Sequence, residues 1–483
     1  MASVEYEQGM RDWLAKLEGM GEVVKVTGAH WDKEMGCIVD LLFRQKAEKA
    51  PALLFDDIPG YPPGYQCLFG MLNSPARLAL TLGMPTSGYR DLMEFVMAYR
   101  KHRQKMKLIE PEYVDSGPVM ENVLEGDQID IFKFPVPIHH ELDGGRFIGT
   151  GDCIITKDPE EGWVNSGTYR MMAVDKNTAI SYISPGRHGR LHRDKYLAQN
   201  KPAPMAVVLG PDPLLWAYSG IDMPHGVSEY AFAGGVRDEP IRVIKGPLTG
   251  LPIPAGAEIV LEGEVSPTET AMEGRYGEWS GYYASSPRPE PVFKVKAIYH
   301  RDNPILNCAP SAKPPHEHLF QRCLLKSALI WDALEKADIP DVTGVWRHAA
   351  GSGLCFTAIS IKQRYFGHSR MAAYVAAHSR PGSYINRFTV VVDEDIDVSS
   401  LNEVIWAMSM RCDPEQDIEI VKKGWGSKLD PLCFNDVYYK SCAIIDACKP
   451  FEHIDDFPIV VETSKEYAKE IEEKWDWLFK GNY

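Results

Sequence analysis

The pattern of hydrophobic residues changes twice along this chain of 483 residues, and no other feature constrains its fold more. About the first hundred residues alternate helical and strand patterns. From about residue 122 to 300 the chain is a series of short β-prone segments separated by glycine and proline turns, and after that helices and strands alternate again. Because such a chain is too long for one hydrophobic core, we expect an α/β unit, a β unit and a second α/β unit.

The first part carries helix and strand signals in close succession. Apolar residues at helical spacing predict a helix over 5–19, and short apolar runs predict strands at 23–26 and 53–55. The Ser74-Pro75 pair is typical of a helix N-cap followed by proline in the first turn. A long helix is expected over 89–107, and its final basic run is interpreted as a solvated helix end.

The central part is expected to be a barrel or a sandwich, because many short strands with turn signals are typical of those folds. In the last of its β-prone segments Phe293, Val295, Ala297 and Tyr299 alternate with Lys294 and Lys296, which is the pattern of a half-buried strand. The predicted strands are 168–174, 179–183, 205–209, 258–265 and 292–299.

The last part is expected to be a parallel sheet flanked by helices. Ser400 and Glu403 form a capping-box pattern at the start of one helix. The predicted helices are 317–335, 368–379 and 401–411, and the predicted strands are 355–361 and 388–392.

A terminal helix is expected after residue 463. Thr463 and Glu466 are predicted to cap it, and its apolar stripe consists of Tyr467, Ile471, Trp475 and Leu478. Such a stripe needs a partner surface, which is either the rest of its own domain or a second subunit.

Composition excludes several classes of protein. The 52 basic side chains against 67 acidic ones give a net charge of −15, which argues against a nucleic-acid footprint. The ten cysteines include no CxxC pair, so a disulfide framework is not expected and a reducing cytoplasm fits best. The N-terminus has no signal-peptide pattern, and no apolar run approaches the ~18 residues of a membrane span. We expect a cytoplasmic protein that binds neither nucleic acid nor membrane.

Seven stretches, in order along the chain, carry the chemical signal. Any one of their charged residues alone would be interpreted as an ordinary surface side chain. Together the stretches resemble the UbiD family of reversible decarboxylases over nearly the whole chain. They are 165–170 (NSGTYR), 184–189 (SPGRHG), 228–235 (SEYAFAGG), 258–263 (EIVLEG), 273–283 (EGRYGEWSGYY), 391–397 (VVDEDID) and Asp430-Pro431.

The resemblance implies a fold and a cofactor. The fold would be an α+β and α/β multidomain arrangement with an N-terminal α/β domain (1–115), a central split β-barrel related to flavin reductases (116–312), a C-terminal α/β domain (313–455) and a C-terminal helix (456–483) as a dimer contact. The cofactor would be prenylated FMN, supplied by a partner flavin prenyltransferase. Its phosphate would be held through Mn²⁺ or Mg²⁺, with K⁺ nearby, and the enzyme would be a homodimer or homohexamer.

The resemblance also implies roles for individual residues. The metal ligands would be Asn165, His188 and Glu229, an oxygen-rich set with one imidazole that suits a hard divalent cation. Arg387 stands where the family usually has a lysine near the cofactor phosphate. The full set of implied cofactor-binding residues is Asn165, Ser166, Gly167, Thr168, Tyr169, Arg170, Arg187, His188, Glu229 and Arg387.

The implied catalytic residues are Arg170, Glu273 and Glu278. Arginine binds carboxylates in a planar bidentate geometry, so Arg170 would hold Glu273 and orient the carboxylate of the substrate. Glu278, buried against flavin and substrate, would have a raised pKa and would donate a proton to the carbon that loses CO₂. The alternatives are a flavin-binding oxidoreductase, which would not need this pair of carboxylates, and a non-catalytic subunit of a carboxylase complex.

The substrate would be a small aromatic, heteroaromatic or α,β-unsaturated carboxylic acid. Three histidines, His316, His318 and His348, match segments that border the family's substrate pocket. The His-x-His pair is also compatible with helix-start polar residues, and no third ligand indicates a metal site there. Which acid is used, and in which direction, stays open.

Overall fold

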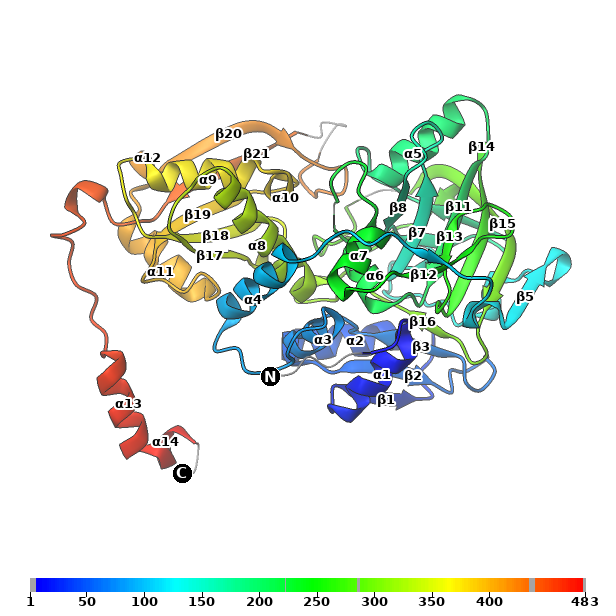
Figure 1. Cartoon of the computed structure of the whole chain (residues 1–483), viewed down its shortest axis with the longest axis horizontal. Coiled ribbons are helices and arrows are strands. Elements are labelled where there is room, and N and C mark those ends of the chain that lie inside the picture. Colours follow the sequence, from blue (N-terminus) through cyan, green and yellow to red (C-terminus); the bar gives the residue numbers. More distant parts are fainter. Residues whose placement is uncertain (1–5, 222, 285–286, 434–438, 481–483) are drawn as a thin grey trace.

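The computed structural model describes residues 6–221, 223–284, 287–433 and 439–480. The N-terminal unit lies against the central sheet, and the C-terminal α/β domain lies beside both (Figure 1). None of the helices in these ranges combines the length and apolar character that a bilayer crossing requires. All ten cysteines are free thiols.

The N-terminal unit is built around a four-stranded sheet of order β1-β2-β3-β16. Its fourth strand, β16 (Ile305–Asn307), comes from beyond the central domain and pairs parallel with β3. Three residues are too short for a sequence pattern to reveal, so this strand was not expected. The Ser74 cap is confirmed, since its hydroxyl accepts a hydrogen bond from the Arg77 amide at 3.1 Å. The other elements of the unit are α1 (Met10–Gly19), β1 (Val23–Thr27), α2 (Glu34–Lys46), β2 (Ala52–Asp56), β3 (Gln66–Phe69) and α3 (Pro75–Thr81).

The helix predicted over 89–107 is α4 (Leu92–Gln104), and the interpretation of its basic end is wrong in part. Arg100 is buried, donates to Asp332 at 2.8 Å and lies 4.6 Å from the centre of the Trp331 ring. Asp332 and Trp331 belong to α8 (Leu319–Lys336) of the C-terminal domain. The basic residues therefore attach α4 to another domain, which local sequence cannot indicate.

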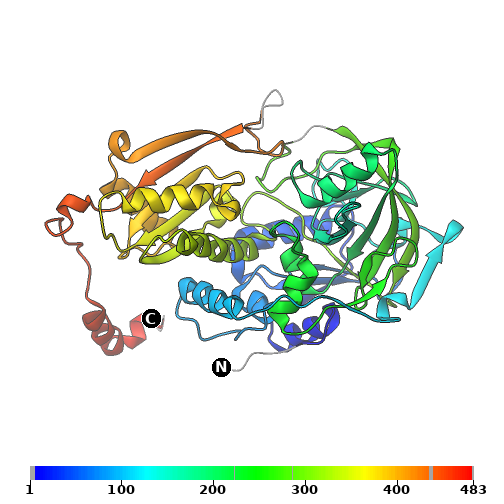
Figure 2. The ribbon, with the colours of Figure 1, turned by 45° about the horizontal axis from the view of Figure 1, so that its top comes forward.

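The central domain is a strongly curled sheet of order β6-β9-β10-β15-β14-β11-β7-β8, with β5 added to β15. Figure 2 shows the long strands β14 (Ile259–Glu273) and β15 (Arg288–His300) bending around it. Two register shifts between them, at Glu262/Gly263 and Val265/Thr270, produce local bends of the kind that β-bulges cause. The remaining strands are β5 (Asn122–Glu125), β6 (Arg146–Gly149), β7 (Asp152–Lys157), β8 (Val164–Gly167), β9 (Met171–Ala173), β10 (Thr178–Ser181) and β11 (Ala203–Leu209).

Both faces of the middle strands are buried, which explains why β11 reads as a nearly continuous apolar run. Val207 and Leu261 belong to a core shared with the N-terminal unit, whereas Ala206 and Val260 belong to a core shared with helices α6 and α7. The helices and short strands of this domain are α5 (His188–Ala198), α6 (Pro213–Ser219), α7 (Glu229–Arg237), β4 (Glu112–Tyr113), β12 (Arg242–Lys245) and β13 (Pro252–Pro254).

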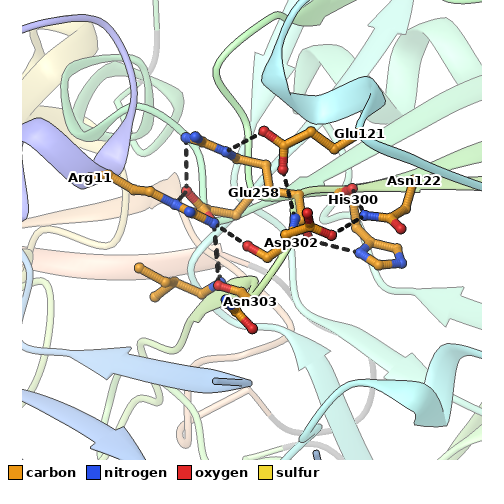
Figure 3. Close-up of polar contacts among 9 residues, drawn as sticks. Arg11, Glu121, Asn122, Glu258, His300, Asp302 and Asn303 are labelled. Carbon is orange, nitrogen blue, oxygen red and sulfur yellow. Dashed lines mark hydrogen bonds and ion pairs between the residues drawn. The ribbon is translucent and has the colours of Figure 1, made fainter. Parts of the chain in front are cut away.

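A charged network attaches α1 to the central sheet (Figure 3). Glu258 is fully buried and accepts two hydrogen bonds from Arg11, at 3.0 and 2.8 Å. Arg11 also donates to the carbonyl of Asp302 at 2.7 Å, and Asp302 accepts from Asn122 at 2.9 Å. The stretch 258–263, which contributed to the family resemblance, therefore contains a residue that joins two domains.

The C-terminal sheet has the order β17-β18-β19-β21-β20 and is mixed, so the prediction of a parallel sheet is wrong at its edges. β18, β19 and β21 run parallel, but β17 and β20 are antiparallel to their neighbours. The Ser400 cap of α11 is present, with the Glu403 amide 3.4 Å from its hydroxyl. The elements are β17 (Val342–Arg347), β18 (Phe356–Ile361), α9 (His368–His378), α10 (Arg380–Ser383), β19 (Phe388–Asp393), α11 (Leu401–Arg411), α12 (Pro414–Asp417), β20 (Ile418–Trp425) and β21 (Tyr439–Asp446).

The chain ends in an arm that reaches away from the C-terminal domain in both views (Figures 1 and 2). It carries α13 (Lys465–Lys474) and α14 (Asp476–Phe479), which are separated at Trp475 and are not the single helix expected. The predicted cap residue is wrong by one position, since Ser464 and not Thr463 accepts from the Tyr467 amide, at 3.3 Å.

Candidate active site

A polar cavity lies between the central sheet and the C-terminal domain. Its wall from the central domain includes Asn165, Arg170 and Glu278, and its wall from the C-terminal domain includes Arg322 and Tyr384. All the proposed metal-binding, flavin-binding and catalytic residues line this cavity except Glu273 and Arg387. Glu273 does not line it but is hydrogen-bonded to Arg170, which does.

Strand β8 and the loop after it form the floor of the cavity. Thr156 of β7 pairs with Asn165 and Ile155 pairs with Ser166, so these side chains are positioned by a sheet and not by a free loop. The loop is fixed from below, because the Thr168 hydroxyl donates to the carbonyl of Asp152 at 2.9 Å and the Tyr169 amide donates to its carboxylate at 3.2 Å. Gly167 leaves the space that this arrangement needs, since a Cβ there would lie 2.3 Å from the Tyr169 hydroxyl.

Two helices begin at the cavity. His188 is the first residue of α5 and Glu229 is the first residue of α7, and both line the cavity wall. The first turn of a helix carries unpaired amides and the positive end of its dipole. The cavity therefore combines two helix N-termini with polar side chains, an environment that favours a bound phosphate.

Arg170 holds two carboxylates. Its Nε and Nη2 donate to the two oxygens of Glu273, both at 2.8 Å, and its Nη1 lies 2.7 Å from Oε1 of Glu278. Glu273 ends β14 and pairs in register with Arg288, the first residue of β15, whose Nη2 lies 3.3 Å from the second Glu273 oxygen. Glu278 follows in a tight turn closed by a hydrogen bond from the Gly281 amide to its carbonyl, at 2.9 Å.

Aromatic rings surround this triad. The guanidinium of Arg170 lies 4.8 Å from the centre of the Tyr182 ring and 5.5 Å from that of Tyr276. Tyr276, Trp279 and Glu278 are all buried. These rings exclude water from the ion pairs, which makes the charges interact more strongly than they would at the surface.

The pKa values of Glu278 and Arg170 both depend on burial, but the outcome differs between the two side chains. Desolvation raises the pKa of Glu278 to about 7, opposed by Arg170 and assisted by Glu273. Desolvation would lower the pKa of Arg170, but Glu278 and Glu273 outweigh it and raise that pKa above its usual value. Arg170 is therefore a permanent cation, whereas Glu278 exchanges a proton near neutral pH.

The residues of the predicted metal set share the cavity and fit a cation. Glu229 is buried, accepts from the Ser166 amide at 2.7 Å and forms no ion pair with a cation among the described residues. Burial raises its pKa to about 8 and lowers the pKa of His188 to about 4, so His188 is a neutral imidazole at pH 7. No group of three His, Cys, Asp or Glu is placed to hold a metal in the described ranges. The predicted ligands do not form such a group, because one of the three is the side-chain amide of Asn165 and not a His, Cys, Asp or Glu.

The structure places four other predicted residues in different surroundings. Arg387 forms an ion pair with Asp430 and does not line the cavity. His318 lines the cavity and bonds to the Ala309 carbonyl at 2.9 Å. His316 is buried behind it, 3.4 Å from the carbonyl of Trp279, and His348 packs on Phe356 with their ring centres 5.4 Å apart.

Three cations of the site were not singled out from the sequence. Arg288 pairs with Glu273, and Arg322 and Lys326 of α8 line the cavity. Arg322 and Lys326 are four residues apart, so they lie on one face of the predicted helix. That spacing was the only available signal, and it is equally typical of a solvated helix face.

Comparison with known proteins places most of the chain in one family. The family models for the N-terminal, Rift-related and C-terminal domains of 3-octaprenyl-4-hydroxybenzoate carboxy-lyase, UbiD, match residues 14–96, 112–314 and 320–447. The chain belongs to the UbiD family. Its relatives include decarboxylases, and its mixed α/β multidomain fold matches that of UbiD-class structures.

Among its relatives is pyrrole-2-carboxylic acid decarboxylase of Pseudomonas aeruginosa, 34% identical over 428 residues, or 84% of each chain. The closed form of vanillic acid decarboxylase from Sedimentibacter hydroxybenzoicus superposes with a TM-score of 0.85 at 27% identity, covering 99% of this chain and 100% of that one. The UbiD-class enzyme HmfF of Pelotomaculum thermopropionicum, in an evolved dimeric form with prFMN, gives 0.79 at 26% identity, covering 96% and 98%.

Proposed function

We propose that this protein is a reversible non-oxidative decarboxylase, or carboxylase, of an aromatic, heteroaromatic or α,β-unsaturated carboxylic acid, and that it depends on prenylated FMN. The observation that carries the proposal is the buried triad in which Arg170 contacts Glu273 at 2.8 Å and Glu278 at 2.7 Å beside a cavity with helix N-termini. Hydride transfer would not need this pair of carboxylates, so the triad favours decarboxylation over the oxidoreductase alternative.

Asn165, His188 and Glu229 would hold Mn²⁺ or Mg²⁺, with K⁺ nearby, and the divalent cation would supply positive charge for the cofactor phosphate. When bound, prenylated FMN would supply an acceptor for the electron pair that C–CO₂ cleavage releases, which side chains cannot provide. A flavin prenyltransferase would have to supply this cofactor. Among the described residues the buried carboxylate of Glu229 has no ion-pair partner, which supports a cation at this place.

Arg170 and Glu278 would share the work on the substrate. A protonated Glu278 has no charge to attract Arg170, so Nη1 becomes available to a substrate carboxylate, while Glu273 keeps the guanidinium in place. After CO₂ leaves, the Glu278 carboxyl donates its proton to the carbon that had carried the carboxylate. In the reverse direction the Glu278 carboxylate accepts the proton that this carbon loses.

Co-expression with a flavin prenyltransferase tests the proposal. We expect protein whose absorbance differs from that of plain FMN and which releases CO₂ from at least one acid in a panel of aromatic, heteroaromatic and cinnamate-type acids. Protein that takes up only plain FMN and leaves every acid unchanged would contradict it.

A histidine pair tests the metal set. We expect His188→Ala to lose metal and flavin together, as measured by elemental analysis and absorbance. His225 is the matched control, because its ring lies 6.2 Å from that of His188 but outside the cavity wall. Full retention of both metal and flavin in His188→Ala would show that the cation binds elsewhere.

A further inference from the structure

The segment 274–278, which carries the proposed proton donor to the cavity, belongs to no helix or strand. The Glu278 carboxylate contacts Nη1 of Arg170 at 2.7 Å, and the Glu278 amide donates to the carbonyl of Tyr282 at 3.0 Å. A side chain on an irregular segment keeps a defined position only when other parts of the chain pack against that segment. The surface that supports 274–278 is therefore part of the site.

The turn 139–145 supplies this supporting surface. The Gly144 amide donates to the carbonyl of Arg275 at 2.8 Å. The two backbones are in contact, because a Cβ at Gly144 would lie 2.6 Å from the Cα of Gly274, and a Cβ at Gly274 would lie 2.4 Å from the Gly144 carbonyl oxygen. Only glycine at both positions allows the turn to lie this close to the segment that ends at Glu278.

Asp143 closes the turn. Its Oδ2 accepts hydrogen bonds from the amides of His139, at 3.2 Å, and His140, at 2.9 Å, and its own amide donates to the His140 carbonyl at 3.1 Å. Nε2 of the His140 ring lies 2.9 Å from the carbonyl oxygen of Ser311, and a Cβ at Gly277 would lie 3.2 Å from Cδ2 of the same ring. The Asp143 carboxylate therefore fixes both the turn and the ring that packs beside Gly277.

Asp143 also lies close to the segment on both sides of Glu278. Desolvation raises the pKa of Asp143, and the backbone amide of Gly277 is among the groups that oppose this shift. Desolvation raises the pKa values of Tyr276 and Tyr283, and the charge of Asp143 raises both further. The carboxylate is thus near the residues that precede Glu278 and near one that follows it.

The charged groups that act on Glu278 come from three other places in the central domain. They are Arg170 after β8, Glu273 at the end of β14 and Arg288 at the start of β15. Asp143 is not one of these groups. Its influence on Glu278 therefore passes through the contact between the turn and the segment, and not through its charge.

We propose that Asp143 is a positioning residue for Glu278, because it holds the turn 139–145 against the segment 274–278 and so keeps the Glu278 carboxyl out of water. Asp143 itself does not line the described cavity wall. The inference rests on the proposed function only for the role of Glu278 as proton donor. An opened turn would admit water, which stabilises the ionised carboxylate, so the loss of Asp143 lowers the pKa of Glu278 toward the ordinary value.

Infrared difference titration of the full chain tests this inference without cofactor or substrate, and Glu278→Gln assigns the Glu278 carboxyl band. In the parent protein we expect Glu278 to titrate with a pKa of about 7. Asp143→Ala should lower this pKa by about one pH unit, because water reaches the carboxyl. Asp143→Asn keeps an oxygen for the amides of His139 and His140 and should retain the parent pKa.

The pH profile of the cofactor-loaded enzyme should shift by the same amount. We expect kcat/KM of Asp143→Ala to fall about tenfold at pH 8 and to stay near the parent value at pH 5, where Glu278 is protonated in both proteins. A general loss of folded protein would lower kcat/KM equally at both pH values. Asp175→Ala is the matched control, since Asp175 accepts a hydrogen bond from the Asn177 amide at 3.0 Å in an exposed turn.

Gly144→Ala covers the case in which Asp143→Ala does not fold. Its added Cβ would press on Gly274 and separate the turn from the segment, so the pKa of Glu278 should fall in the same way. A Glu278 pKa that is unchanged or raised in Asp143→Ala, or in Gly144→Ala if the first variant does not fold, would overturn the inference.

An equal fall of the Glu278 pKa in Asp143→Asn and Asp143→Ala would also overturn the inference, because the charge and not the hydrogen bonds of Asp143 would then act on Glu278. Failure of the proposed function is distinguishable. A parent protein that releases CO₂ from no acid, but whose Glu278 pKa falls in Asp143→Ala, would retain the positioning role without the reaction.

Discussion

Glu278 and Arg170 illustrate how burial at a single residue creates a proton donor. A carboxyl group in water is almost fully ionised at pH 7 and would be a poor acid there. In this cavity desolvation raises the pKa of Glu278 to about 7, although Arg170 contacts it at 2.7 Å. Glu273 contributes to this raised pKa, because it accepts hydrogen bonds from two of the three guanidinium nitrogens of Arg170, both at 2.8 Å.

The pH dependence of CO₂ release should follow Glu278. Because the donor is the protonated form and its pKa is about 7, we expect kcat/KM to be level below that pH and to fall about tenfold per pH unit above it. Arg170, Glu273 and Arg288 are the charged groups that act on it. A profile that rises with pH through this range would contradict the role of Glu278 as the acid.

Replacement of Glu278 should separate chemistry from binding. We expect Glu278→Gln to lower CO₂ release by about 10²–10⁴-fold, with cofactor retained, because glutamine has the shape but cannot donate the proton. Exchange with solvent of the ring or vinyl proton of the decarboxylated product, at the carbon that carried the carboxylate, should be lost with it. Glu264→Gln, at a half-buried acid that pairs with Lys296 on the same sheet and lies on the same strand β14 as Glu273, is the control. Normal turnover in Glu278→Gln would remove it from the mechanism.

At the scale of elements, the domains are joined by ion pairs between charged side chains that are distant in the sequence. Arg11 of α1 reaches Glu258 at the start of β14, and Arg100 of α4 reaches Asp332 of α8. Each pair has one fully or nearly fully buried member, so the loss of its partner would leave a buried charge with less compensation. Glu258 would keep Arg301, at 3.6 Å, and Arg100 would keep Glu335. The first contact joins the N-terminal unit to the central sheet, and the second joins it to α8 of the C-terminal domain.

Removal of Arg11 should therefore destabilise the N-terminal unit. We expect Arg11→Ala to cost about 1–3 kcal/mol, less than the ~3–5 kcal/mol of a fully buried pair because the Arg11 side chain is 36% exposed. Urea unfolding followed by tryptophan fluorescence would measure it. Arg44→Ala removes an exposed pair with Asp40 and should cost about 0–0.5 kcal/mol. Equal effects of the two substitutions would show that Glu258 does not need Arg11.

At the scale of the whole molecule, the C-terminal arm reaches away from the body of the protein in both views (Figures 1 and 2). Its exposed side chains include Ile459, Val461, Trp477, Leu478 and Phe479. The C-terminal domain also exposes Ile405, Trp406 and Met410 on α11. Apolar surface of this extent is rarely left in water, and of the two partners expected from the sequence, a second copy of the chain now fits better than the arm's own domain.

Truncation of the arm should change the mass of the assembly. We expect the full chain to be a dimer or a hexamer in light scattering, and a chain lacking residues 456–483 to be smaller. A full-length variant with Trp477→Ser and Phe479→Ser should show the same loss if the apolar face makes the contact. An unchanged mass in both proteins would show that the arm does not join subunits.

The sequence by itself determined the order of the three parts, several of the helices and strands, and the identity of the family, because local periodicity and ordered motifs depend on neighbouring residues alone. It also indicated Arg170, Glu273 and Glu278, which lie together in the cavity although 103 residues separate the first two. Only the tertiary structure decided that β16 returns to the first sheet, that α4 packs on α8, and that Arg322 and Lys326 face the cavity while Arg387 pairs with Asp430. These outcomes depend on which surfaces meet after the chain has folded, and no local pattern records them.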